Sequence, residues 1–355
     1  MPVRASFLRR ALLNRTAILG AAVVILFAAG ILLGSYTVTI PDFFRILTAH
    51  LTGGERIPGA SFIVMESKLP RAVIGTMIGV AFGLSGGLFQ TMLRNPLASP
   101  DVIGISYGAS AAAVTAIVVF GATGAAVSGA ALGGALGVAA LIYGISRSGA
   151  LRGGSGSRAG SGSAAGNRLI LAGVGIASAL GALVNFLLTR TDIRTAADAL
   201  VWLNGSLNHA SWDRAGVLAA ALLVLVPAVA VLAGPLRIIE LGDDTAAGLG
   251  IRVDRARLGV VLTAVSLAAV ATAAAGPVAF VAFLAGPIAR RFTGKASLPA
   301  SALVGALIVL AADYFAANFA PLLLDGTALP VGVVTGALGA PFLLWLLVTA
   351  NRKDA

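Results

Sequence analysis

Residues that could carry out acid–base, nucleophilic or metal chemistry are scarce in this chain. Its 355 residues include no Cys, two His and 14 Asp or Glu, which excludes iron–sulfur clusters, cysteine–zinc sites and disulfides. The sequence has no HExxH or GxSxG motif, and Gly294-Lys295 lacks the preceding glycine that a phosphate-binding loop needs. We therefore expect no active site, no ATPase site and no metal or cofactor bound by this chain.

One acid, Asp313 in the segment LAADYFAANFA, lies well inside an apolar stretch. Gradient-driven transporters use ionisable groups at membrane depth, so ion coupling is one possible role. Polar side chains also hold the helices of a membrane bundle together. We expect Asp313 to have the structural role, either accepting hydrogen bonds from a neighbouring helix or capping a broken one.

A second concentration of charge is the segment 237–257, with the sequence RIIELGDDTAAGLGIRVDRAR. Glu240, Asp243 and Asp244 precede most of its basic residues, an order that complements a helix dipole. Either aspartate can act as an N-cap, and Gly250 suits the C-terminal end of a helix. The pattern predicts two short helices lying under a membrane, where they could dock a cytoplasmic partner. An ordered connecting loop is the alternative.

The elements that carry these residues must be membrane helices. Apolar residues make up 58% of the chain and charged residues 11%, with a mean hydropathy of +0.97. Soluble domains have about 25% charged residues, so this composition excludes a soluble enzyme. Stretches without charge, each about 20 residues or longer, predict membrane spans. They are 16–40, 72–93, 102–146, 169–189, 215–236, 258–289, 296–312 and 326–351.

Two of these stretches are long enough to cross the membrane twice. The first, 102–146, contains Gly121 and Gly124 near its middle, and the second, 258–289, contains Gly276-Pro277. We expect a tight turn at the two glycines of the first stretch. Proline disrupts helix interiors, so we expect the second stretch to break at Gly276-Pro277, with a short span after the break. An all-α integral membrane domain with ten spans over residues 16–351 is therefore predicted.

The distribution of basic residues sets the orientation of these spans. With the N-terminus inside, 18 of the 25 Lys and Arg fall on the inner side and seven on the outer side. This bias follows the positive-inside rule. It predicts a protein of the cell (inner) membrane with cytoplasmic tails at 1–15 and 352–355, and it explains the net charge of +11 without a nucleic-acid partner. We interpret the first apolar run as a retained span rather than a cleaved signal peptide.

Small residues are concentrated in one loop and in three helical strips. The segment 147–168, rich in Gly, Ser and Arg, predicts a flexible cytoplasmic loop, with anionic-lipid contact as the alternative. Strips of small residues at every fourth position predict close packing of membrane helices. The three strips are Gly75, Gly79, Gly83 and Gly87; Gly129, Gly133 and Gly137; and Gly332, Gly336 and Ala340.

Several sequence blocks occur in a fixed order over about residues 60–345. They are Leu69-Pro-Arg71, Gly79–Gly87 with Gln90, Arg94–Ala109 (RNPLASPDVIGISYGA), Leu171–Val174 (LAGV), Trp202–Leu207 (WLNGSL), Glu240–Gly250 (ELGDDTAAGLG), Gly276–Phe280 (GPVAF) and Leu329–Pro341 (LPVGVVTGALGAP). Together these blocks resemble the iron-siderophore and vitamin B12 permease family, the type II ABC importers. The variants SPDVIG, ELGDDTA and WLNGSLN look most like the ferric-enterobactin type.

The resemblance implies a set of partners. They are a second permease subunit, a homologue rather than a second copy in the favoured case, two cytoplasmic ATPases that hold ATP and Mg, and an extracytoplasmic substrate-binding protein. It also implies coupling helices that sit in a groove of the ATPases. The implied contact residues are Glu240, Leu241, Gly242, Asp243, Asp244, Ala246, Ala247, Leu249 and Gly250. The leucines and alanines would supply apolar contact, and the three acids would face Arg or Lys of the ATPases.

On the outer side, the resemblance assigns Lys68 and Arg71 to acids on the lobes of the binding protein. Side chains that anchor at the membrane interface are the alternative. Polar residues that could line the path are Asn95, Ser99, Ser106, Asn185 and Asn204, although such residues also serve packing and turns. The favoured cargo is a ferric catecholate siderophore, with iron held by its chelate. Cobalamin or haem within the family and a gradient-driven secondary transporter outside it are the alternatives.

Overall fold

The structure is a computed structural model that describes residues 2–34, 36–54, 57–100, 104–152, 161–324 and 326–351. Every regular element in these ranges is a helix. The longer helices are α1 (Pro2–Leu32), α4 (Leu69–Met92), α5 (Ile105–Phe120), α6 (Ala125–Arg152), α7 (Ser161–Arg190), α9 (Trp212–Ile239), α11 (Val253–Ala275), α12 (Val281–Thr293), α13 (Leu298–Asn318) and α15 (Val331–Asn351). The short elements are α2 (Ile40–Thr52), α3 (Ala60–Phe62), the π-helical η1 (Ile63–Lys68), α8 (Ile193–Leu203), α10 (Asp243–Gly248) and α14 (Ala320–Leu323).

The all-α membrane fold is confirmed, and each predicted span contains one longer helix. Seven helical segments among the described residues are long and apolar enough to cross a membrane. Two shorter apolar segments, Ile105–Phe120 and Val331–Trp345, accompany them. The helix breaks predicted in the two longest stretches are present, at Gly121 (φ 60°) and at Gly276 (φ 76°). The count of ten crossings stays a prediction.

Helix ends differ from the sequence expectation in three places. Helix α1 begins at Pro2, inside the predicted N-terminal tail. Helices α6 and α7 extend into both ends of the predicted loop 147–168, and residues 153–160 lie outside the described ranges, as does the tail 352–355. The segment 237–257 contains one short helix, α10, where two were predicted, because its first residues complete α9 and its last residues begin α11.

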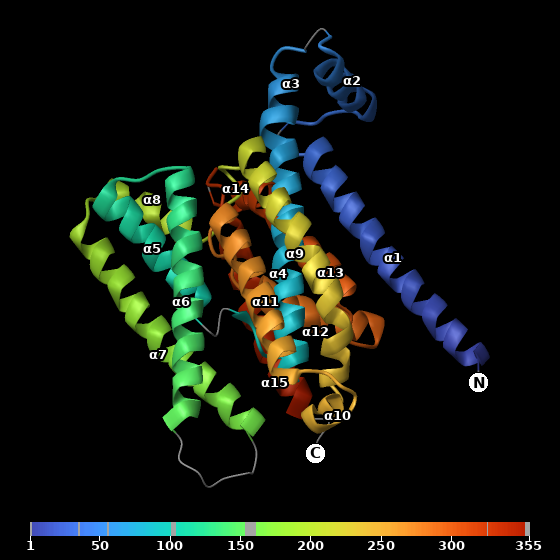
Figure 1. The fold of residues 1–355 in the computed structure, drawn as a ribbon. Coiled ribbons are helices and arrows are strands. Elements are labelled where there is room, and N and C mark those ends of the chain that lie inside the picture. Colours follow the sequence, from blue (N-terminus) through green and yellow to red (C-terminus); the bar gives the residue numbers. More distant parts are fainter. Residues whose placement is uncertain are drawn as a thin grey trace.

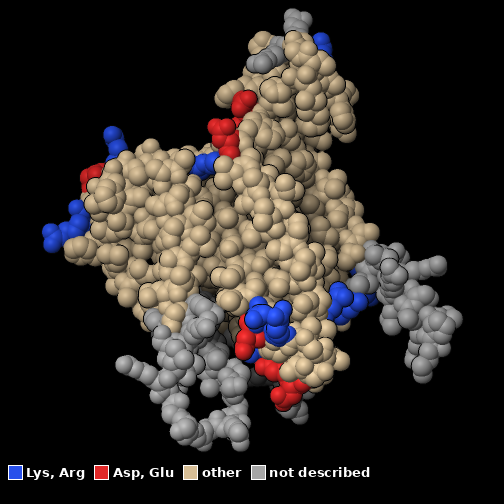
Figure 2. Space-filling model, in the orientation of Figure 1, with Lys and Arg blue, Asp and Glu red and all other residues tan. Residues whose placement is uncertain are grey.

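The bundle is organised around α4, which packs against α13, α11, α12 and α9 (Figure 1). Helices α5, α6 and α7 form one flank, and α1 lies on the opposite side (Figure 1). The start of α1, the end of α15 and α10 lie at one end of the bundle, and α2, α3, α8 and α14 lie at the other (Figure 1). On the face shown in Figure 2, a broad band without charged side chains separates the charged groups of the two ends, as a membrane protein requires.

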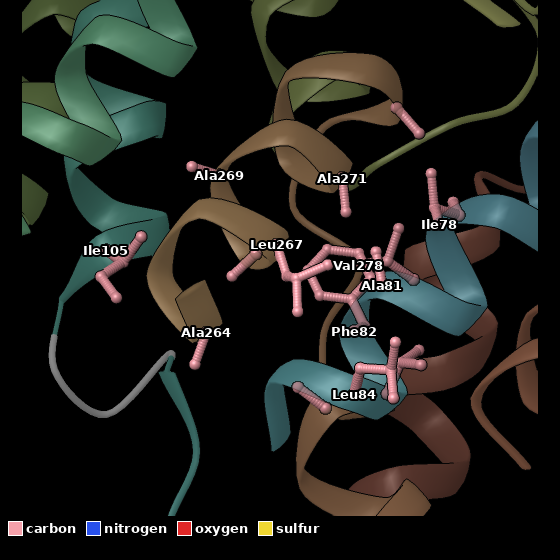
Figure 3. Close-up of a cluster of buried hydrophobic side chains, with 14 of the residues drawn as sticks. Ile78, Ala81, Phe82, Leu84, Ile105, Ala264, Leu267, Ala269, Ala271 and Val278 are labelled. Carbon is pink, nitrogen blue, oxygen red and sulfur yellow. The ribbon is translucent and has the colours of Figure 1, made fainter. Parts of the chain in front are cut away.

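The core lies where α4 meets α11. Phe82 of α4 is 1% exposed, and its ring extends toward Leu267 of α11 and Val278 of the following turn (Figure 3). Ile105 of α5 lies across α11 from them, close to Ala264 and Ala269 (Figure 3). Alanine on α11 lets neighbouring helices approach on both of its sides. This packing places the C-terminal end of α4 beside the ends of α9 and α11.

The first predicted glycine strip brings α4 and α13 into backbone contact, as expected. A Cβ added at Gly79 would lie 2.5 Å from the Cα of Ala306, and one at Gly83 would overlap the carbonyl oxygen of Ser301. Gly305 on α13 faces the backbone of Gly79 in the same way, so both helices lack a side chain at the crossing. Such close approach favours packing and weak backbone contacts in a membrane.

The second and third strips behave differently. Added Cβ atoms at Gly129, Gly133 and Gly137 of α6 would meet nothing within 4 Å among the described residues, so the close packing predicted for this strip is wrong within the chain. The α6 glycine that packs on α5 is Gly134 instead. Only Gly332 of the third strip meets another backbone, that of Asn204; at Gly336 an added Cβ would meet nothing within 4 Å of the described chain.

A buried glutamine of α4 bonds to α12 where a proline removes a backbone hydrogen bond from that helix. Pro287 has no N–H, so the carbonyl of Phe283 one turn earlier loses its helical partner. Gln90 of α4 is 4% exposed, and its Nε2 donates to that carbonyl oxygen at 2.9 Å. In lipid, an unpaired backbone carbonyl is costly, so this bond lets a proline-containing helix pack inside the bundle.

Candidate functional site

One end of the bundle, called the inner end here because the charge distribution predicts that it is cytoplasmic, presents α10 on a tight turn. Helix α9 ends at Ile239, and Gly242 takes φ 119° to act as the N-cap of α10. Asp243 and Asp244 then occupy the first turn, where carboxylates complement the helix dipole. The N-cap is therefore the glycine and neither aspartate. Gly250 follows the C-cap with φ 83°, and α11 begins three residues later.

The apolar residues of this turn divide between the interior and the surface. Ala246 is fully buried against the bundle. Leu241 and Leu249 are 69% and 62% exposed, and Asp244 and Ala247 are exposed beside them. Glu240 and Gly242 are half-buried, and Gly250 is exposed. Exposed leucines at the charged end of a membrane protein, away from the lipid-facing band, are typical of an interaction surface. Acidic and basic side chains gather at this end in Figure 2.

Asp243 has partners within its own chain. Its two carboxylate oxygens both lie 2.9 Å from Nη2 of Arg257, at the start of α11. Nη2 of Arg94, just after α4, lies 3.3 Å from Oδ1. Sequence reasoning missed both arginines, because 149 residues separate Arg94 from Asp243 and no local pattern joins them. Asp244, in contrast, is exposed on the surface of α10.

At the opposite end of the bundle, called the outer end after the same predicted orientation, Arg71 pairs with Asp313. Its Nε lies 2.8 and 3.1 Å from the two carboxylate oxygens, and its Nη2 lies 2.8 Å from Oδ1. Nη1 donates to Oδ1 of Asn208 at 2.9 Å. The pair joins α4 to α13, and the side chains are 24% and 13% exposed. The expectation that Asp313 accepts hydrogen bonds from a neighbouring helix is confirmed.

Lys68, three residues before Arg71, holds the end of α1. Its Nζ donates to the carbonyl oxygens of Ile31, Leu33 and Tyr36 at 3.1, 2.8 and 2.5 Å. Carbonyls at a helix C-terminus lack intrahelical partners and attract a cation. Both cations that the sequence assigned to docking therefore also have structural bonds inside the chain.

Two of the five polar residues predicted to line a path, Asn95 and Ser99, lie in the connection between α4 and α5, and the other three lie on or next to α5, α7 and α8. Oδ1 of Asn95 accepts from the backbone N–H of Leu97 at 2.9 Å, and Nδ2 of Asn204 donates to the carbonyl of Leu200 at 2.8 Å. Both thus make turn or helix-end bonds. The remaining three are Ser99, which is buried, Ser106, which is half-buried on α5, and Asn185, which is exposed on α7. Within the described ranges, no group of three or more His, Asp or Glu could hold a metal ion.

The sequence profile of the FecCD transport family matches residues 22–349. The chain belongs to the FecCD transport family. It is 37% identical over 350 residues to the ferric enterobactin transport system permease protein FepG of Escherichia coli (strain K12), covering 98% of this chain and 99% of that protein. It is 38% identical over 298 residues to the achromobactin transport system permease protein CbrC of Dickeya dadantii (strain 3937), covering 82% and 80%.

A further relative is the Fe(3+)-citrate import system permease protein YfmE of Bacillus subtilis (strain 168), at 34% identity over 82% of this chain and 84% of that protein. A solved inward-facing structure of a metal-chelate type ABC transporter superposes with a TM-score of 0.77 at 24% identity, covering 94% of this chain and 98% of that chain. The prediction of an iron-chelate ABC permease, rather than an enzyme, is confirmed at the level of the family.

Proposed function

We propose that this chain is the membrane permease subunit of an ATP-driven importer of ferric siderophores of the enterobactin kind. The observation that carries the proposal is the similarity to the enterobactin permease protein over nearly the full length of both chains. Relatives named for achromobactin, citrate and hydroxamate transport match at 30–38% identity, which favours a ferric chelate as the cargo class. Iron crosses inside its chelate, so the chain supplies a path and no metal ligands.

In this proposal the chain crosses the inner membrane ten times with both termini in the cytoplasm. The tails 1–15 and 352–355 and the loop 147–168 lie on the cytoplasmic side. A homologous permease subunit completes the path, two ATPases bind below, and a substrate-binding protein delivers the chelate from outside. The path-lining roles of Asn95, Ser99, Ser106, Asn185 and Asn204 belong to this proposal.

The ATPase contact is assigned to the segment from Glu240 to Gly250. Leu241, Ala247 and Leu249 supply exposed apolar surface, with Asp244 beside them as the acid that faces the partner. Ala246 and Asp243 support this surface from the inside. Leu249→Ser is expected to lower co-purification of the ATPases, whereas Arg255→Ala, an exposed change outside the segment, leaves it unchanged. Equal co-purification by both variants would overturn this assignment.

The docking role of Lys68 and Arg71 needs a test that separates docking from their internal bonds. Arg71→Gln removes the cation, whereas Asp313→Asn breaks the same ion pair and leaves the cation available. If Arg71 binds an acid of the binding protein, capture falls only in Arg71→Gln. An equal loss in both variants identifies a structural role and removes Arg71 from the docking site. Lys68→Gln is measured in the same pull-down.

The cargo is tested by uptake in cells with and without the chain. Radiolabelled ferric enterobactin, ferric citrate and cobalamin are compared at equal concentrations. Loss of enterobactin uptake alone on deletion supports the proposal, and loss of another cargo alone contradicts it. A gradient-driven transporter is disfavoured because Asp313, the acid it would use, is paired with Arg71. Uptake that persists when the ATPases are inactivated would restore that alternative.

A further inference from the structure

Three charged side chains from different helices meet at the base of α10. Asp243, the first residue of α10, accepts from Arg257 of α11 and from Arg94 after α4. The Nη2 of Arg94 also donates to the carbonyl oxygen of Ile239, the last residue of α9. One cluster of side chains thus joins the ends of α4, α9, α10 and α11. We name Arg94, Asp243 and Arg257 the inner charge cluster.

The backbone at Arg94 is unusual for its residue type. Its φ is 50°, one of two positive values found for non-glycine residues in the described chain. The N–H of Asn95 donates to the carbonyl of Gln90 at 3.1 Å, which closes the end of α4 in a turn that usually has glycine at this position. A left-handed conformation at a residue with a Cβ is unfavourable and persists where the surroundings hold it. Here it directs the Arg94 guanidinium to α9 and α10.

The inner charge cluster has little to contribute to stability. The Arg94 and Asp243 side chains are 45% and 37% exposed, and ion pairs at such exposure are weak because solvent screens them. The cluster contributes more to the orientation of α10 than to stability. Helix α10 has six residues and one buried side chain, Ala246, and it follows Gly242, whose φ is 119°. Without the two arginines, α10 has few contacts that fix its orientation on the bundle.

The cluster also lies at the foot of the central helix. Helix α4 packs on α13, α11, α12 and α9, so a displacement at its C-terminal end reaches most of the bundle. Coupling between distant parts of a protein needs contiguous contacts of this kind. A displacement of α10 therefore moves α4 through Arg94 and moves α11 through Arg257. Asp243 is the shared acceptor and therefore faces its own chain rather than a partner.

We propose that the inner charge cluster is a positioning device that transmits movement of α10 to α4 and α11. This inference rests on the proposed function, in which the surface of α10 contacts the ATPases. It assigns Asp243 a different task from Asp244, although the two residues are adjacent on the same helix. Asp244 and the leucines bind the partner, and Asp243 makes the bound helix move with the bundle.

The test uses the full transporter, with ATPases, partner permease subunit and binding protein, in proteoliposomes. Asp243→Asn, Arg94→Gln and Arg257→Gln remove one member each, and Asp254→Asn is the matched control, an exposed acid at the start of α11. Uptake of ferric enterobactin and ATP hydrolysis are measured on the same samples. Expected for the three cluster variants is normal assembly and hydrolysis, with uptake per ATP lowered about tenfold, a loss typical of coupling energies. The control is expected to match the unmodified chain.

The double variant Arg94→Gln with Asp243→Asn should lose no more coupling than Asp243→Asn alone, because Asp243→Asn has already broken the link from Arg94 to α10. Normal uptake per ATP in Asp243→Asn refutes the inference. Loss of ATPase co-purification in that variant also refutes it, and makes Asp243 a contact residue. Failure of the unmodified chain to bind the ATPases would instead refute the proposed function, so the two failures are distinguishable.

A second measurement is independent of uptake. Because the chain has no Cys, two introduced cysteines can be spin-labelled without removing any native ones. Labels at Gly248→Cys on α10 and Arg255→Cys on α11 report the distance between these helices. The inference predicts one narrow distance distribution, which broadens when Asp243→Asn is added and stays narrow with Asp254→Asn. An unchanged distribution in Asp243→Asn overturns the inference.

Discussion

The ion pair between Arg71 and Asp313 allows a quantitative prediction. Replacing Asp313 by Ala leaves a guanidinium that is 24% exposed without its bidentate partner. Breaking a fully buried pair costs about 3–5 kcal/mol, and an exposed pair contributes about 0–1 kcal/mol. The exposures of 24% and 13% lie between these cases, so we expect Asp313→Ala to lower the free energy of unfolding by about 2 kcal/mol.

Unfolding in mixed detergent micelles at increasing SDS fraction measures this change. The full cycle compares Asp313→Leu, Arg71→Met and the double variant. Since each single change strands one charge and the double change strands none, the double variant should lose less stability than the two single variants added together. Asn208→Ala, which removes only the second partner of Arg71, should cost about 1 kcal/mol.

The reasoning is refuted if the two single effects add to within about 0.5 kcal/mol, because that result identifies independent side chains. In that case the glycine contact and apolar side-chain packing, without a contribution from the ion pair, would hold α4 and α13 together. A large coupling energy instead shows that changes at Arg71 alter the bundle itself, so a docking phenotype at this residue must be compared with Asp313→Asn.

Three further outcomes are expected. Gly83→Val should abolish stable insertion, because its side chain would collide with the Ser301 backbone, whereas Gly129→Ala, with nothing within 4 Å, should leave abundance and detergent unfolding unchanged. Gln90→Leu should lower the free energy of unfolding by about 1–3 kcal/mol, because the Phe283 carbonyl loses its donor; full stability would show that another group replaces it. Hydrogen bonds from Thr195, led by its backbone N–H, lower the pKa of the exposed Asp192 carboxyl below 3.8, so the ionised cap favours α8 at neutral pH and this contribution is lost as pH falls through the folded-state pKa. The protection of the Thr195 amide against exchange, corrected for the intrinsic pH dependence of the exchange rate, should therefore fall in acid in the unmodified chain but not in Asp192→Ala, and identical protection profiles would contradict the role of this cap.

Much of the fold could be predicted from the sequence, because span length is a local property. The helix break at Gly276 agrees with the glycine–proline pair there, but α9 continues through Gly234-Pro235 and α12 through Gly286-Pro287, so such a pair does not by itself end a helix. Strips of glycine were less informative, since every fourth position defines a helix face but not what lies opposite. The strip containing Gly79 meets α13, whereas the strip containing Gly133 meets nothing in the described chain, and only tertiary packing distinguishes them.

The candidate sites were predictable in position but not in orientation. The acids of 237–257 indicated a surface at the inner end. They did not indicate that Asp243 faces the rest of its own chain whereas Asp244 faces away from it. That distinction depends on Arg94, which approaches from a helix end 149 residues earlier. Likewise, the partner of Asp313 lies 242 residues away, at Arg71. Long-range ion pairs of this kind leave no periodic pattern that one sequence can reveal.

The connection between Lys68 and the end of α1 has a consequence for biogenesis. Helix α1 leaves the ribosome before η1, which carries the lysine that binds the carbonyls of Ile31, Leu33 and Tyr36, and well before its packing partner α13. Only 17% of its apolar window is buried by the described chain, so α1 needs little cover from the later helices. Helix α1 can therefore enter the membrane as an autonomous anchor, and Lys68 then fixes its outer end as the second hydrophobic segment is inserted.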